Sequence, residues 1–107
     1  MINLPAPISD YLAADAKGGD VVAQCFTDGG VVKDEGKLYA GREAIRAWKT
    51  ESSTKYNYVS APQAMVKDGD KTVVTSRLTG NFPGSPLDLR FFFRLDGDQI
   101  SELDIKP

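Results

Sequence analysis

The chain of 107 residues is 41% hydrophobic and 26% charged, which is typical of one globular domain with a single core. Its formal net charge is -2 and basic residues form no run, so we expect no binding to nucleic acid or to a membrane surface. No stretch is long and apolar enough to span a bilayer, and no signal peptide is recognisable, so a cytoplasmic location is predicted.

The absence of histidine limits the chemistry that the chain can perform. It removes the usual zinc ligand and every Ser-His-Asp or Cys-His arrangement, and no loop carries closely spaced acids. The one cysteine, Cys25, can form no internal disulfide and is predicted to be a buried small hydrophobic residue. We therefore predict no metal site and no cofactor, and acid–base chemistry must use carboxylates and tyrosines.

Apolar residues at helical spacing predict two short N-terminal helices. In the first, Ile8, Tyr11 and Leu12 form one inward face, with Asp15 off this face.

The second helix follows a Gly-Gly-Asp sequence, in which Asp20 is placed to accept backbone N–H bonds. Val22, Cys25 and Phe26 form its apolar face, and the Asp-Gly-Gly sequence at residues 28–30 is predicted to be a turn.

A short strand at residues 31–34 carries the principal candidate for catalysis. Because strand side chains alternate, Asp34 shares a face with Val32 and is expected to point toward the interior. A carboxylate in an apolar pocket has a raised pKa and becomes a better proton acceptor. Asp34 is thus a candidate general base; the alternatives are an exposed strand end or an ion pair with Arg42 or Arg77.

After a turn at residues 35–37, a third helix is predicted to start at Gly41. Its buried stripe comprises Ala44, Ile45 and Trp48. Its solvated side is predicted to carry the charged residues Arg42, Glu43, Arg46, Lys49 and Glu51.

The second half of the chain alternates as strands do. Four antiparallel strands are predicted at residues 56–66, 71–80, 87–95 and 100–105. Asp-Gly turns join the first pair and the last pair, whereas the proline-rich segment 81–86 is a loop at one rim of the sheet.

The third of these strands predicts two different faces. The face that the helices cover carries Leu87, Leu89, Phe91, Phe93 and Leu95. The outer face carries Asp88, Arg90, Phe92 and Arg94. An aromatic residue on an exposed sheet face indicates an interface, so a homodimer through the outer sheet face is predicted.

Together the elements predict an α+β fold in which N-terminal helices pack on a curved, mostly antiparallel sheet, in the order helix-helix-strand-helix-four strands. A cavity open at one end is expected between the layers, where a small apolar molecule would bind. Its lining is predicted to include Trp48, Tyr39, Tyr58, Phe91 and Phe93.

The segment from Phe26 to Trp48 resembles the SnoaL-like polyketide cyclases and ketosteroid isomerases of the nuclear-transport-factor-2-like superfamily. The resemblance extends over the whole chain and implies one cone-shaped, cystatin-like domain, residues 1–107, with a ligand pocket. In ketosteroid isomerases a Val-x-Asp strand after the second helix carries the base, and Val32-Lys33-Asp34 matches it. Their oxyanion-binding tyrosine lies in a Tyr-x-Ala-Ala context, which Tyr11-Leu12-Ala13-Ala14 matches.

The second acid of ketosteroid isomerases does not transfer in the same way. That acid lies in a Pro-apolar-Asp sequence, which Pro86-Leu87-Asp88 resembles. Strand alternation, however, places Asp88 on the outer face of the sheet. Counting back from the Asp-Gly turn places Phe91 at the position of the family's second acid. The family's polyketide cyclases commonly have a pocket histidine, which this chain lacks.

Two functions remain open from the sequence. One is an isomerase or cyclase in which Asp34 moves a proton of a small apolar carbonyl compound and Tyr11 stabilises the enolate oxygen. The other is a non-catalytic ligand-binding or dimeric accessory module, in which Asp34 only orients the ligand or accepts a backbone hydrogen bond. The alternative for Tyr11 is an ordinary core tyrosine with its hydroxyl group at the rim. A fold of this kind does not by itself decide between them.

Overall fold

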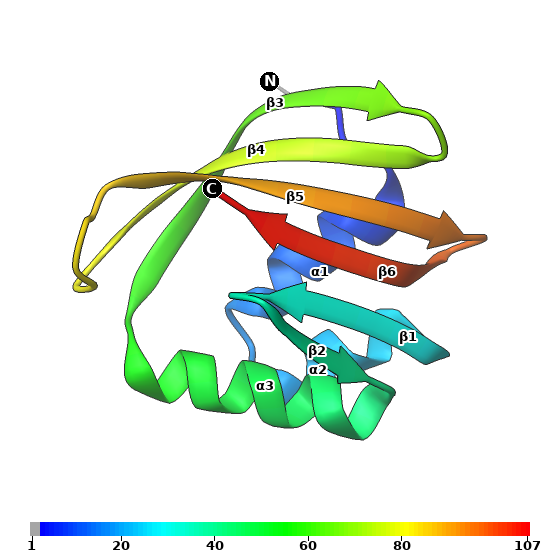
Figure 1. Ribbon diagram of the computed structural model, residues 1–107, viewed down its shortest axis with the longest axis horizontal. Helices are drawn as coiled ribbons and strands as arrows, with labels where there is room; N and C mark the ends of the chain where they lie inside the picture. Colours follow the sequence, from blue (N-terminus) through cyan, green and yellow to red (C-terminus); the bar gives the residue numbers. More distant parts are fainter. Residues whose placement is uncertain (1–2) are drawn as a thin grey trace.

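The computed structural model describes residues 3–107; the predicted domain also includes Met1 and Ile2, which lie outside the described residues. In chain order the elements are α1 (Ala6–Asp15), α2 (Gly19–Gln24), β1 (Phe26–Asp34), β2 (Lys37–Ala40), α3 (Arg42–Lys55), β3 (Tyr58–Asp68), β4 (Lys71–Gly80), β5 (Leu87–Asp96) and β6 (Gln99–Lys106). The strands form one sheet in the order β2-β1-β6-β5-β4-β3. Figure 1 shows α1 and α2 on one side of this curved sheet and α3 beside β1 and β2. The predicted α+β class is confirmed.

Strands β3 to β6 form the predicted antiparallel meander, and β6 then pairs in parallel with β1. The two Asp-Gly turns are placed as predicted. Gly69 and Gly97 both have φ of 63°, a left-handed conformation that glycine adopts without steric cost. The parallel pairing places β1, which ends at Asp34, between the edge strand β2 and β6.

The predicted turn at residues 28–30 is wrong, because these residues lie inside β1. Phe26 starts this strand, so its assignment to the second helix is also wrong. The pairing of β1 with β6 shifts between Phe26 and Val31, so the strand absorbs the glycines as an irregularity. A Cβ on Gly30 would lie 2.9 Å from the Cβ of Phe26, so the close approach requires glycine there.

Strand β2 was not predicted, and the element order is therefore helix-helix-two strands-helix-four strands. Its four residues form a short edge strand whose side chains are mostly exposed, so its sequence shows no alternation of apolar and polar residues. The predicted cap of α2 is also wrong: Gly18 is the N-cap, and Asp20 lies in the first turn, 3.7 Å from Arg46. Cys25 is only partly buried.

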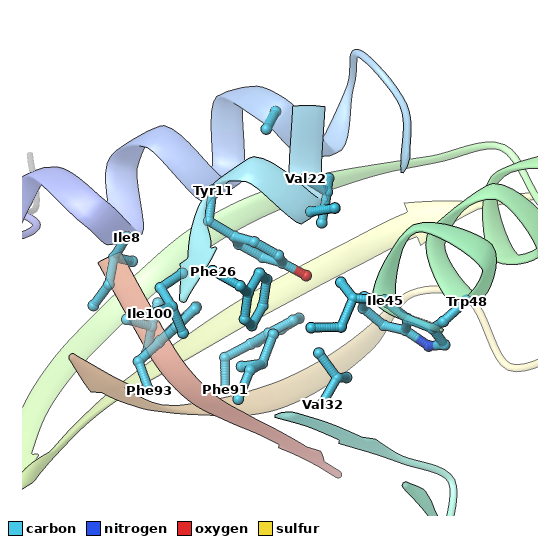
Figure 2. Close-up of a cluster of buried hydrophobic side chains, with 14 residues drawn as sticks. Ile8, Tyr11, Val22, Phe26, Val32, Ile45, Trp48, Phe91, Phe93 and Ile100 are labelled. Atoms are coloured by element: carbon cyan, nitrogen blue, oxygen red, sulfur yellow. The ribbon is translucent and has the colours of Figure 1, made fainter. Parts of the chain in front are cut away.

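The core lies between the helices and the inner face of the sheet (Figure 2). Tyr11 of α1 packs edge-on against Phe26 and Phe93, with ring centroids 6.2 Å and 5.5 Å apart. The predicted inner face of β5 is buried at Phe91 and Phe93, but Leu87 at its start is 39% exposed. The core therefore fills one end of the space under the sheet and stops short of the other end. None of the helices in the described residues is long and apolar enough to cross a membrane.

Candidate functional site

A cavity of about 390 Å³ lies at the end of the sheet that the core leaves unfilled. Six of the seven predicted site residues line it: Tyr11, Asp34, Tyr39, Trp48, Tyr58 and Phe91. The seventh, Phe93, is absent from the lining and packs against Tyr11 in the core. Within residues 3–107, no group of three or more acidic or cysteine side chains is placed to hold a metal ion.

Asp34 is positioned by the alternation of β1. Val32, two residues earlier, is fully buried, and Asp34 points to the same side at the last position of the strand. Its Oδ2 accepts a hydrogen bond from Nε1 of Trp48 at 3.0 Å. The two arginines that could have neutralised it pair elsewhere, Arg42 with Asp28 and Arg77 with Asp88.

The surroundings of Asp34 favour the protonated form of its carboxyl group more than water would. Burial raises the pKa of its carboxyl group above the ordinary value, and the neighbouring Glu35 raises it further. The hydrogen bond from Trp48, the positive charge of Lys49 and a backbone hydrogen bond from Glu35 lower the pKa without cancelling the rise. Asp34 therefore has the character expected of a proton acceptor that works nearer neutral pH than a free aspartate.

Tyr11 brings a hydroxyl group to the same cavity from α1. Its side chain is 2% exposed, and in Figure 2 its oxygen points from the aromatic core toward the side where Ile45 and Trp48 lie. Burial raises the pKa of Tyr11 well above 10.0, and the negative charges of Asp15 and Asp34 contribute to the rise. The hydroxyl group thus stays protonated near neutral pH and is available as a hydrogen-bond donor.

A second polar group in the cavity was missed from the sequence. Lys49, predicted to be solvated, is 2% exposed, and Asp15, predicted to lie off the apolar face, has a side chain that is 14% exposed. The two form an ion pair, and Lys49 Nζ also donates to the hydroxyl oxygen of Tyr58 at 2.5 Å. The hydroxyl group of Tyr58 in turn lies 3.3 Å from Oδ1 of Asp15.

Helical spacing gives a partial signal for both charged residues. Asp15 follows Tyr11 by four positions and Lys49 follows Ile45 by four, so each lies on the buried side of its helix. Burial alone would lower the pKa of Lys49, but the adjacent Asp15 and Tyr58 outweigh this effect and raise it above 10.5. The ammonium group is therefore charged at neutral pH, and it is neutralised by Asp15.

Aromatic and apolar side chains form the remaining walls. The rings of Tyr39 and Trp48 lie 6.0 Å apart, and Phe82 from the loop between β4 and β5 packs edge-on against Tyr56 at 6.2 Å. This loop is where the sequence predicted it, at one rim of the sheet. Asp88 lies on the outer face in an ion pair with Arg77, whereas Phe91 lines the cavity, as strand alternation predicted.

Comparisons with known proteins agree with this architecture. The family model described as the SnoaL-like domain matches residues 10–103. A structure from Sinorhizobium meliloti, which carries a provisional polyketide cyclase name, is 34% identical, with a TM-score of 0.89 over 96% of this chain and 95% of that chain. No curated protein matches the chain.

More distant structures share the fold. A Catenulispora acidiphila protein with a ketosteroid isomerase-like fold, solved with trimethylamine, is 19% identical, with a TM-score of 0.84 over 98% of this chain and 87% of that chain. A cystatin-fold protein from Novosphingobium aromaticivorans is 17% identical, with a TM-score of 0.75 over 94% of this chain and 95% of that chain. The comparisons confirm the predicted resemblance and fold.

Proposed function

Because this chain belongs to the SnoaL-like domain family, we propose that it is a proton-transfer enzyme of the isomerase or cyclase type. Its substrate is a small carbonyl compound with an acidic C–H bond, and Asp34 is the general base. The observation that carries the proposal is a carboxylate at the cavity wall whose pKa is raised by burial and which no arginine neutralises. The provisional polyketide cyclase name of the Sinorhizobium meliloti protein supports the same chemistry.

In the proposed reaction, Asp34 removes the proton from the carbon next to the carbonyl group. The electrons of the C–H bond form a C=C bond, and the carbonyl π electrons move to the oxygen, which becomes an enolate. The Tyr11 hydroxyl group donates a hydrogen bond to this oxygen as its charge develops. In an isomerisation the substrate has a C=C bond one carbon further from the carbonyl group, and Asp34 returns the proton to the far carbon of that bond as the enolate electrons flow back and the C=C bond shifts. In a cyclisation the enolate carbon attacks a second carbonyl carbon, the π electrons of that carbonyl group move to its oxygen, and this oxygen takes the proton from Asp34.

Trp48 has a supporting role in this scheme. Its N–H group donates a hydrogen bond to Oδ2 of Asp34 and so restrains the orientation of the carboxylate. Its ring, together with that of Tyr39, offers an apolar surface for the substrate body. Positioning of this kind lowers the entropic cost of bringing the C–H bond to the base.

The proposal is tested by the exchange of substrate protons for deuterium. Incubation of β-tetralone, a small enolisable ketone, with the protein in D₂O should replace its acidic protons faster than buffer does, as measured by proton NMR. Asp34→Asn should reduce the enzymatic rate by about 10²-fold to 10⁴-fold, which is the usual contribution of a general base. Asp88→Asn is the matched control, because it alters an outer-face carboxylate and should leave the rate unchanged.

A non-catalytic ligand-binding module is the second candidate. It is favoured by Phe91, which lines the cavity at the position where the resemblance to ketosteroid isomerases implies a second acid. In that case β-tetralone would bind, but its protons would exchange no faster than in buffer. Asp34→Asn would then change neither the affinity for β-tetralone nor the exchange rate.

A further inference from the structure

A second cavity, of about 630 Å³, adjoins the first one. The two cavities share Asp34 and three apolar residues of β5 and β6, which are Leu87, Leu89 and Ile105. Asp34 therefore lies where the two cavities meet. We call the second cavity the outer groove; Leu38 of β2 lines the outer groove but not the first cavity.

The register of the strands explains where the outer groove lies. β5 pairs with β6 from Arg90 onward, opposite Lys106, so the earlier residues of β5 extend past the end of β6. Figure 1 shows the end of β1, the end of β6 and the start of β5 at the same end of the sheet. The start of β5 thus overhangs the space off the ends of β1 and β6, and this space is the outer groove.

The outer groove exposes apolar side chains to water. Leu38 is 61% exposed and Leu87 is 39% exposed. Leu87 and Leu89 lie on the same side of β5 as Phe91, because strand side chains alternate. At about 3.4 Å per residue, these side chains form an apolar track that runs roughly 14 Å outward from Phe91. Apolar side chains gathered along one exposed groove are typical of a binding surface.

The charges around the outer groove favour an uncharged occupant. Lys33 forms an ion pair with Glu102 at 3.6 Å, and Lys106 forms one with Asp104 at 3.5 Å. The lining as a whole contains three lysines and three acidic residues, so neither sign dominates. A charged ligand group therefore gains little there, whereas an apolar chain removes the exposed leucine side chains from water.

We propose that the outer groove binds an uncharged alkyl chain attached to the carbon from which Asp34 removes the proton. The head of the substrate fills the first cavity, and its alkyl chain passes Asp34 and follows Leu89 and Leu87 toward Leu38. The inference rests on the proposed function, because it places the reacting carbon at Asp34. It adds the class of the substrate, which is an alkyl-substituted ketone.

The test uses β-tetralones that carry an n-alkyl chain on C1, the acidic carbon next to the aromatic ring. Isothermal titration calorimetry gives the dissociation constants of the methyl and the hexyl compound. Complete burial of one methylene group tightens binding about fourfold. The groove is partly open to water, so the hexyl compound should bind at least about tenfold more tightly than the methyl compound.

Two variants assign this chain-length gain to the outer groove. Leu38→Ser and Leu87→Ser each remove apolar surface from the groove, so each should reduce the gain to about threefold or less. Val59→Ser is the matched control, because Val59 is 71% exposed on β3 and lines neither cavity. It should keep the full gain. Circular dichroism checks that each variant is folded.

Affinity and proton exchange separate this inference from the proposed function. A gain that depends on Leu38, observed without proton exchange, would overturn the proposed reaction and leave the outer groove as the chain-binding site. Proton exchange with equal binding of the two compounds, or no measurable binding of the hexyl compound, would overturn the groove.

The variants give two further outcomes that would overturn the inference. One is a gain that Leu38→Ser and Leu87→Ser leave as large as Val59→Ser does, since the chain would then lie elsewhere. The other is a Leu38→Ser variant that keeps the gain but sediments as a smaller species than the wild type. That result would identify the outer groove as an interface between two copies of the chain.

Discussion

Trp48 and Asp34 are joined by a hydrogen bond of 3.0 Å from the indole Nε1 to Oδ2, which links α3 to the end of β1. The contact opposes the effect of burial on the carboxyl group, because a donor stabilises the ionised form. Asp34 is thus held in one orientation and is kept able to ionise inside a largely apolar cavity. Proton transfer by this residue requires both properties.

Removal of this donor should change the ionisation of Asp34. In Trp48→Phe an aromatic ring remains but the N–H group is lost, so the pKa of Asp34 should rise further. Carboxyl-carbon NMR titration measures this pKa directly. Tyr39→Phe, which changes the ring beside Trp48 but removes no hydrogen bond to Asp34, is the control. An unchanged pKa in Trp48→Phe would show that the contact does not stabilise the carboxylate.

The raised pKa of Asp34 also has a consequence for stability. The folded protein binds this proton more tightly than the unfolded chain, so stability falls as the pH rises from the ordinary pKa of an aspartate through the raised folded pKa. Asp34→Asn removes the titrating group and should therefore unfold at a higher temperature than the wild type at pH 7. Thermal unfolding across a pH series should show this gain shrinking to nothing in acid, below the ordinary value. A variant less stable than the wild type at neutral pH would contradict the account.

The buried ion pair of Lys49 and Asp15 should be costly to break from one side. Lys49→Met leaves the Asp15 carboxylate buried without its partner and should lower the free energy of unfolding by about 3–5 kcal/mol. The double variant Lys49→Met/Asp15→Asn should lose much less than the sum of the two single variants, as measured by urea unfolding. Arg46→Met is a control on the same helix, because its exposed ion pair with Glu43 is screened by water and should contribute little to stability.

The pH range of this ion pair follows from the raised pKa of Lys49. The folded pKa lies above 10.5, so the contribution of the pair to stability is fully present below that value and is lost as the pH rises through the folded pKa. Between pH 7 and pH 9 the cost of Lys49→Met should therefore stay constant. A cost that falls within this range would mean that Lys49 is largely neutral there.

The outer sheet face predicts a homodimer. Phe92 lies there with Val73 directly opposite on β4, and Arg90 and Lys106 flank its ring at 5.4 Å and 5.3 Å. We expect a dimer at micromolar concentration in analytical ultracentrifugation and a monomer for Phe92→Glu. Leu38→Glu is the control, since Leu38 is 61% exposed on the edge strand β2, away from this face. A wild type that sediments as a monomer would refute the prediction.

The sheet could be predicted from the sequence because its signals are local. The Asp-Gly turns fix the hairpins, and the alternation along residues 87–95 fixes which face of β5 meets the helices. The same alternation gave the correct side for Asp34, because Val32 two residues earlier had to be buried. By contrast, β2 has too few residues to show a pattern, and a glycine such as Gly30 can mark either a turn or a strand irregularity.

The polar half of the site was not predicted because burial of a charged residue depends on its partner. Lys49 and Asp15 lie on the buried sides of their helices, but neither would be stable there alone. The pairing involves residues 34 positions apart in the sequence, on α1 and α3, and local spacing carries no information about it.

The central claim is that ionised Asp34 removes the substrate proton, and one paired measurement tests it most directly. The pKa of Asp34 is obtained by carboxyl-carbon NMR titration, and the rate of β-tetralone deuterium exchange is followed over the same pH range. The account predicts a pKa above the ~3.9 of a free aspartate, and an exchange rate that rises with pH around the same midpoint. An ordinary pKa, or exchange that continues undiminished below the midpoint, would contradict it.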